Sequence, residues 1–207
     1  MTRPVESPRL SVLIGRYQGV SIDVLVVCSA GRCRSPIAAA LLGVHAETAA
    51  AKLQAHSGAL VGAHGAMPPV GVTLMNELGI DLSGHRSLPV TPESMRAADL
   101  IFGMDREHVR ELISRSPDAR PKTFTLTEFV HRAEQAAPRG RHQRLTDWLD
   151  QVGDGRGDDG ADLVGVADDI VDPYAQRPEV WRAVIAQLDD LTQRAVAVLG
   201  TRRSLAR

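Results

Sequence analysis

This chain contains little cysteine and few aromatic residues. Of its 207 residues two are cysteines, and aromatic residues make up 3% of the total. Two cysteines in one short stretch, Cys28 and Cys33, do not make the disulfide framework of a small secreted domain. The N-terminus lacks a continuous apolar core of the kind a signal peptide has, and no run is long enough to span a membrane. We therefore expect a cytoplasmic protein.

An excess of charge of either sign is also missing. The chain has 24 Lys and Arg against 25 Asp and Glu, a net charge of −1. This balance points to neither nucleic acid nor an anionic membrane as a partner. The seven histidines show no metal-ligand spacing, so we expect no metal and no cofactor. The length suits one domain with a substantial core, and nothing in the sequence indicates an oligomeric state.

The most informative segment is an apolar run that ends at a cysteine. Ile22 to Val27 is nearly all apolar and β-branched, which is typical of a strand buried on both faces. Cys28 follows it. Pro36 suits the first position of a helix, and Ser35 before it suits the N-cap. We expect this helix to run from Ile37 to about Leu53.

A loop that joins a strand to a helix N-terminus favours anion binding. The backbone N–H groups of such a loop can form a nest, and the helix dipole points into it. Arg34 adds a planar cation that grips two oxygens, and Ser35 can donate to a thiolate. A cysteine in this field is favoured as a nucleophile. The pattern predicts phosphoryl transfer through Cys28, with phosphate bound by Ser29, Ala30, Gly31, Arg32, Cys33 and Ser35.

The loop from Cys28 to Pro36 resembles the signature of the low-molecular-weight protein tyrosine phosphatases, Cys-x5-Arg-Ser followed by Pro. Three further blocks resemble that family in the right order: Gly79–Arg86, Asp99–Leu112 and Asp172–Tyr174. The resemblance covers most of residues 22–130 and 168–200. It implies a single-domain α/β fold, a four-stranded parallel sheet flanked by helices on both faces.

The resemblance also implies a mechanism. Cys28 would form a phosphocysteine, Arg34 would stabilise the transition state, and Asp172 would be general acid and then base. The proline after Asp172 restrains that carboxylate on its loop. Asp168 and Asp169 lie close by in sequence, but neither precedes a proline.

The supporting residues depart from the family pattern at one loop position. The family has Asn where this chain has Gly31. The family's Ser-Ala-Gly-Thr segment is matched only in part by residues 56–59, which are His-Ser-Gly-Ala. The supporting histidine has a match at His85. Glycine keeps the left-handed geometry without strain, but the side-chain tether is lost. We therefore expect a more mobile loop.

The pocket is also expected to be more basic than usual. Arg32 stands where a tyrosine-specific member often has an apolar residue, and no aromatic residue occurs between Val44 and Ile101. Tyr174 is the one obvious residue for stacking on a substrate ring. Either Arg32 points into the pocket mouth, which favours substrates with a second anionic group or a non-tyrosine phosphoester, or it is a solvated loop side chain.

Cys33 has two interpretations. As the family resemblance suggests, it can form a reversible disulfide with Cys28 that protects the nucleophile from deeper oxidation. Alternatively it is a buried thiol that fills space behind the loop.

The remaining pattern alternates strands with helices, which predicts a parallel sheet covered on both faces. We expect strands at 52–56, at 99–103 and within 121–126. Helices are expected at 68–78, from 92, from 106 to about 114, after 125 and at 178–199.

Two segments are extra to the family pattern. Residues 1–20 form an N-terminal extension to the phosphatase domain at 21–207. An insert at about 131–167 holds a helix around Leu145–Val152 and a loose acidic stretch, Gly153–Gly160. We expect this insert to be a solvated surface segment; a lid or partner-binding arm is the alternative.

Four functions follow from these residues. The first is a phosphatase for phosphotyrosine in proteins, and the second a phosphatase for a small molecule or phosphoarginine. An arsenate reductase would need further cysteines, and none follows Cys33. A non-catalytic phosphate-binding module is disfavoured by the intact set of Cys28, Arg34 and Asp172.

Overall fold

The computed structural model describes residues 21–62, 64–157 and 169–200. Its centre is a four-stranded parallel sheet, as the sequence predicted, and the strand order is β2-β1-β3-β4. The four strands are β1 Ile22–Cys28, β2 Leu53–Ala59, β3 Leu100–Gly103 and β4 Thr123–Thr125. The N-terminal extension lies outside the described residues.

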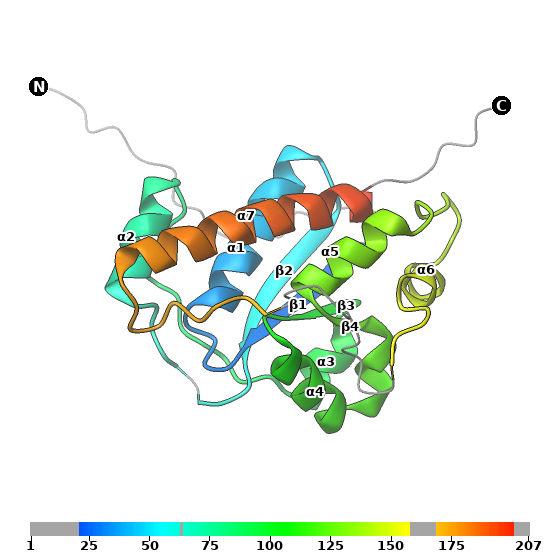
Figure 1. Cartoon of the computed structure of the whole chain (residues 1–207), viewed down its shortest axis with the longest axis horizontal. Coiled ribbons are helices and arrows are strands. Elements are labelled where there is room, and N and C mark those ends of the chain that lie inside the picture. The colour runs from blue at the N-terminus through cyan, green and yellow to red at the C-terminus, as the bar shows by residue number, and fades with distance from the viewer. Residues whose placement is uncertain (1–20, 63, 158–168, 201–207) are drawn as a thin grey trace, which may run out of the picture.

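Helices cover both faces of this sheet (Figure 1). The helices packed with the larger core on one face are α1 Arg34–Thr48, α2 Pro69–Glu77, α5 Leu126–Gln135, α6 Leu145–Val152 and α7 Pro178–Gly200. The other face carries α3 Pro92–Ala97, α4 Arg106–Arg115 and the 3₁₀ helix Pro117–Lys122. The expected four-stranded, doubly covered fold is confirmed.

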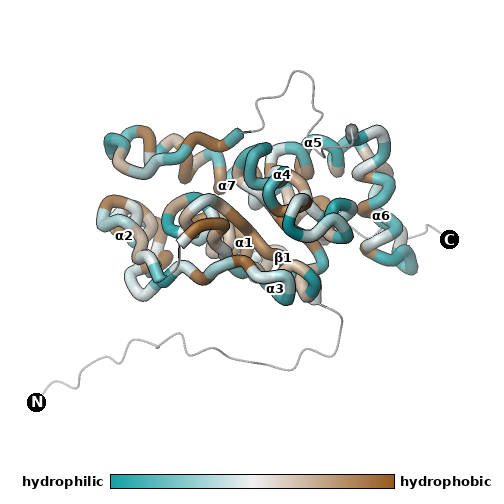
Figure 2. The backbone as a smooth tube through the Cα atoms, turned by 90° about the horizontal axis from the view of Figure 1, so that it is seen from below, coloured by the Kyte–Doolittle hydropathy of each residue, from teal (hydrophilic) through white to brown (hydrophobic). Residues whose placement is uncertain are grey.

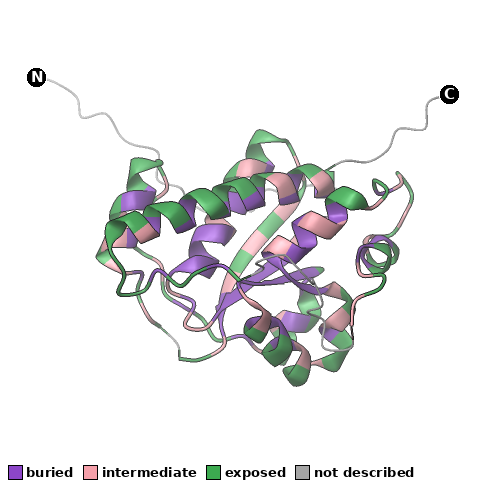
Figure 3. Cartoon of the chain, viewed as in Figure 1, coloured by how far each residue is buried: buried purple, intermediate pink, exposed green. Residues whose placement is uncertain are grey.

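Strand β1 is apolar because it is covered by helices on both faces. Val24, Val26 and Cys28 belong to the larger core, whereas Leu25 and Val27 belong to the smaller one. Successive side chains point to opposite faces of a sheet, so a strand between two layers needs apolar residues at every position. Figure 3 shows the buried residues concentrated along this strand, and Figure 2 shows the hydrophobic colouring on β1 and α1.

Helix α1 differs from the sequence prediction at both ends. It begins at Arg34, and Cys33 occupies the N-cap without a side-chain hydrogen bond, so the predicted N-cap role of Ser35 is wrong. The Ser35 hydroxyl faces Cys28 and β2 instead. The helix ends at Thr48, not near Leu53, because Ala50 takes a positive φ of 51° and turns the chain into β2.

The insert was expected to be a solvated surface segment, and its described part is solvated on one side and buried on the other. Helix α6 has the predicted bounds, but Trp148 is 1% exposed and packs edge-on against Phe129. The first residues of the expected loose stretch are also fixed, because Arg156 ion-pairs with the buried Glu128. Residues 158–160 of that stretch lie outside the described part. Among the described residues, no helix is long and apolar enough to cross a membrane.

Candidate active site

Cys28 ends β1 at the carboxyl edge of the sheet, where ligands bind in open α/β folds. Its Sγ lies 3.1 Å from the Ser35 Oγ, which also lies 3.3 Å from the Gly58 carbonyl oxygen. The hydroxyl carries one proton, which it can donate to either acceptor. When it donates to Sγ, it stabilises the thiolate.

The loop is held at Gly31, which has a φ of +62°. The Gly31 carbonyl accepts a hydrogen bond of 2.7 Å from His85 Nε2. A Cβ at Gly31 would lie 2.9 Å from the Ala59 Cβ and 3.0 Å from the Ser87 Cβ. The backbone therefore carries the histidine tether, and close packing as well as φ requires glycine here.

Arg34 is the buried cation of the site, with a side chain 5% exposed. Its Nη1 donates to Asp105 Oδ2 at 3.1 Å and to the Ile170 carbonyl at 3.0 Å. Its Nη2 donates to Asp172 Oδ2 at 2.9 Å. Its buried Nε has no hydrogen-bond partner within the described part of the chain. A buried, unpaired donor beside the loop is suited to an anion.

Of the candidate acids, Asp172 is the one that reaches the loop. Its Oδ1 accepts from the Tyr174 N–H at 3.0 Å, and its side chain remains 47% exposed. Asp169 instead accepts from the Arg106 backbone at 2.9 Å and pairs with that residue's guanidinium. Asp168 lies outside the described residues.

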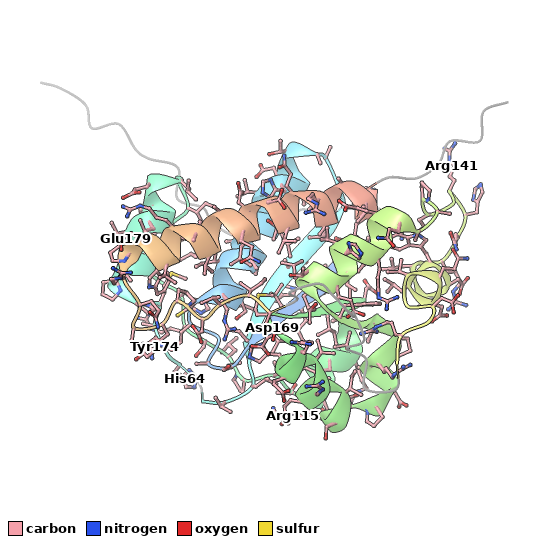
Figure 4. The ribbon with its side chains drawn as sticks, viewed as in Figure 1. His64, Arg115, Arg141, Asp169, Tyr174 and Glu179 are labelled. Atoms are coloured by element: carbon pink, nitrogen blue, oxygen red, sulfur yellow. The ribbon has the colours of Figure 1, made fainter. Side chains whose placement is uncertain are left out.

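Six of the predicted site residues line a pocket of about 200 Å³: Cys28, Ala30, Arg32, Cys33, Asp172 and Tyr174. The predicted Ser29, Gly31, Arg34 and Ser35 are not among its lining residues, and Arg34 is connected to it through Asp172. The Arg32 guanidinium carbon lies 5.1 Å from the centroid of the Tyr174 ring, so the two side chains stack at the pocket. Arg32 therefore lines the pocket and is half-buried. Figure 4 shows Tyr174 on the chain leading into α7, with His64 towards the same end of the molecule.

Both cysteines are free thiols and both are buried. Burial, with a smaller contribution from the Asp172 charge, raises the pKa of Cys33 to about 12. Cys33 is therefore a protonated thiol at neutral pH. Its role as a redox partner of Cys28 stays a prediction.

Two residues were missed as parts of the site, Asp105 and His108. Asp105 caps α4 by accepting from the His108 N–H at 2.8 Å, and its other oxygen holds Arg34. His108 Nε2 lies 2.8 Å from the Ser29 Oγ. Burial lowers the pKa of His108, which favours the neutral ring. Both follow β3, the neighbour of β1, so the strand order was the signal that could have found them.

Comparison with known proteins decides the family. Residues 23–139 match the family described as Low molecular weight phosphotyrosine protein phosphatase. The chain belongs to this family.

Similar proteins align with most of this chain. A protein-arginine-phosphatase of Geobacillus stearothermophilus is 30% identical over 86% of this chain and 96% of its own length. The protein-tyrosine-phosphatase Etp of Escherichia coli K12 is 30% identical over 58% of this chain and 80% of its own. A solved low molecular weight protein tyrosine phosphatase from T. tengcongensis matches with a TM-score of 0.66 and 26% identity, over 86% of this chain and 99% of that one.

These findings confirm the predicted family and enzyme class. The chain is a low molecular weight, cysteine-dependent phosphatase. The alternatives of an arsenate reductase and of a non-catalytic phosphate-binding module are set aside. The relatives include both tyrosine and arginine phosphatases, so the choice between these substrates has to come from the pocket.

Proposed function

We propose that this phosphatase removes the phosphoryl group from phosphotyrosine in proteins, with Cys28 as nucleophile. The observation that carries the proposal is that Cys28 and Asp172 line one pocket together with Tyr174, and that Arg34 donates a hydrogen bond to Asp172. A cysteine nucleophile has to remain reduced, which suits the cytoplasm as its compartment.

The proposed reaction has two steps. The Cys28 thiolate attacks phosphorus, the S–P bond forms, and the bond from phosphorus to the tyrosine oxygen breaks as Asp172 protonates that oxygen. Water then attacks phosphorus and gives its proton to Asp172, and the S–P bond breaks to release phosphate. Arg34 Nε and the loop N–H groups stabilise the phosphoryl oxygens in both steps.

The pocket wall favours tyrosine over arginine. The Tyr174 ring, 51% exposed, can stack on the ring of a substrate tyrosine. Phosphoarginine places a guanidinium beside the phosphoryl group, and the Arg32 cation at the pocket would repel it. The loop is thus suited to a neutral aromatic leaving group. Phosphoarginine is the second candidate because relatives act on it.

A pair of matched peptides tests the substrate. The peptides share one sequence and carry either phosphotyrosine or phosphoarginine, and phosphate release is followed without added metal. We expect a kcat/KM at least about tenfold higher for phosphotyrosine, a difference near 1.4 kcal/mol. A higher value for phosphoarginine would make the second candidate correct.

The nucleophile is tested on the same peptides. Cys28→Ser should abolish turnover, because an alcohol is a poor nucleophile at its ordinary pKa. Gly43→Ser is the control, since Gly43 lies on α1, would have no neighbour within 4 Å of an added Cβ, and does not line the pocket. Full activity in Cys28→Ser would reject the phosphocysteine mechanism.

A further inference from the structure

Arg32 is held in one orientation by three contacts. Its Nε donates to the Ala66 carbonyl at 2.8 Å, and its guanidinium stacks on Tyr174. Its aliphatic stem packs so closely on Gly65 that a Cβ there would lie 2.6 Å from the Arg32 Cδ. An arginine fixed in this way loses little side-chain entropy when it binds a ligand.

The two Nη atoms of this guanidinium form the edge that can bind a ligand. Within the described part of the chain, neither Nη atom of Arg32 has a hydrogen-bond or ion-pair partner. The nearby acid, Asp172, already accepts from Arg34 and from the Tyr174 backbone. Arg32 also lines the same pocket as Cys28, so it faces a bound substrate.

We propose that Arg32 forms a second anion site beside the phosphate pocket, and that it binds the carboxylate of an acidic residue flanking the phosphotyrosine. This inference rests on the proposed tyrosine activity and narrows it to substrates with acidic sequence next to the phosphorylated residue. The planar fork of arginine matches a carboxylate, and stacking on Tyr174 keeps the fork in place.

Gly65 belongs to this site although it does not bind substrate. Any side chain at this position would collide with the Arg32 stem. Gly65→Ala therefore displaces the guanidinium without changing the catalytic loop or the charge. This gives a second, independent way to remove the site.

The test uses two phosphotyrosine peptides of otherwise identical sequence. In one peptide both residues that flank the phosphotyrosine are glutamate, and in the other both are glutamine. The measured quantity is the ratio of kcat/KM for the glutamate peptide to that for the glutamine peptide. We expect a ratio of about ten in the wild type, as for a hydrogen bond between charged groups. Arg32→Gln and Gly65→Ala should each bring the ratio close to one, whereas Arg32→Lys should give an intermediate value because it keeps the charge and loses the fork.

Arg115→Gln is the matched control, because Arg115 pairs with Glu111 and does not line the pocket. It should keep the wild-type ratio. Thermal unfolding of each variant checks that it is folded. A wild-type ratio near one, or an unchanged ratio in Arg32→Gln, would overturn the second anion site.

The same peptides separate this inference from the proposed function. If the glutamine peptide is hydrolysed without any preference for glutamate, the tyrosine activity stands and the second site is wrong. Calorimetry on Cys28→Ser measures the affinity for the glutamate and the glutamine peptide. The ratio of these affinities gives the preference for glutamate in the absence of turnover. If neither tyrosine peptide is hydrolysed while the phosphoarginine peptide is, the proposed function is wrong.

Discussion

Arg34 donates a hydrogen bond of 2.9 Å to Asp172, a residue 138 positions further along the chain. The loop that binds the phosphoryl group and the segment that carries the proposed acid are thereby held together. The pairing places the Asp172 carboxylate directly beside the guanidinium of the loop. Substrate phosphate would compete for the same guanidinium, which releases Asp172 to act on the leaving oxygen.

The first prediction concerns Asp172→Asn and the basicity of the leaving group. A general acid contributes about 10²–10⁴-fold, and it is needed most when the leaving oxygen is basic. We expect Asp172→Asn to lower kcat/KM, which reports the step in which the leaving group departs, by about 10²-fold or more on phosphotyrosine and by much less on para-nitrophenyl phosphate, whose leaving group is acidic. Steady-state kinetics on the two substrates measure this difference.

Asp169→Asn is the control for that experiment. Asp169 lies three residues before Asp172 but pairs with Arg106. It should show no dependence on the leaving group. An equal loss on both substrates in Asp172→Asn would contradict the role of general acid.

The second prediction concerns His108 and pH. Burial lowers the pKa of His108 below its ordinary value, although the Asp105 charge opposes this and Arg34 reinforces it. As the pH falls, His108 is therefore protonated at a higher pH in the unfolded chain than in the folded chain. The contribution of neutral His108 to the free energy of unfolding is fully present above about pH 6.5. It is lost as the pH falls from there through the lowered pKa of the folded chain. The free energy of unfolding in urea should decrease in that window.

His108→Gln should reduce this pH dependence, because glutamine does not titrate and can still form a hydrogen bond with the Ser29 hydroxyl. The more distant charges of Asp169 and Asp172 remain in the variant. His56→Gln is the control, since the His56 side chain is 57% exposed. If His108→Gln kept the wild-type slope between pH 5 and 7, His108 would not be its source.

The local part of the site could be predicted from the sequence. The β1 strand, the loop and the start of α1 lie within the fifteen residues from Ile22 to Pro36, and residue types such as Cys28, Arg34 and Pro36 restrict that geometry strongly. The start of the helix was misplaced because Ser35 has good N-cap chemistry, and a tertiary contact with Gly58 outweighs it.

The long-range part of the site could not be predicted in the same way. Asp105 looked like an ordinary helix cap, and its second role depends on β3 lying beside β1 in the sheet. The stacking of Arg32 on Tyr174 likewise joins residues 142 positions apart. Contacts of this kind arise from packing, and no local pattern records them.

The third prediction concerns Gly31. Asparagine, the family residue at this position, tolerates a positive φ, but its Cβ would lie too close to the Ala59 and Ser87 side chains. We expect Gly31→Asn to lower the free energy of unfolding by about 1–3 kcal/mol, the usual effect of overpacking. Urea denaturation measures this loss. Gly43→Asn, at a helix position with no neighbour within 4 Å, is the control and should cost less.

The last prediction concerns the buried ion pair that anchors the insert. Glu128 is 1% exposed and pairs with the buried Arg156 at 2.8 Å and with Arg132 at 3.0 Å. Arg156 also donates to the Thr123 carbonyl and lies over the Phe124 ring. Glu128→Gln removes the carboxylate charge that pairs with the buried guanidinium, which should cost about 3–5 kcal/mol in urea denaturation.

Glu134→Gln on the same helix separates burial from charge. Its partner Arg194 is 41% exposed, and exposed pairs contribute about 0–1 kcal/mol. Replacing both Glu128 and Arg156 by methionine should cost less than Glu128→Gln alone, because the buried guanidinium is then removed together with the carboxylate, and the second partner, Arg132, is 14% exposed. Equal losses in Glu128→Gln and Glu134→Gln would show that the insert is not anchored by this pair, and its attachment would then depend on Trp148 and its neighbours.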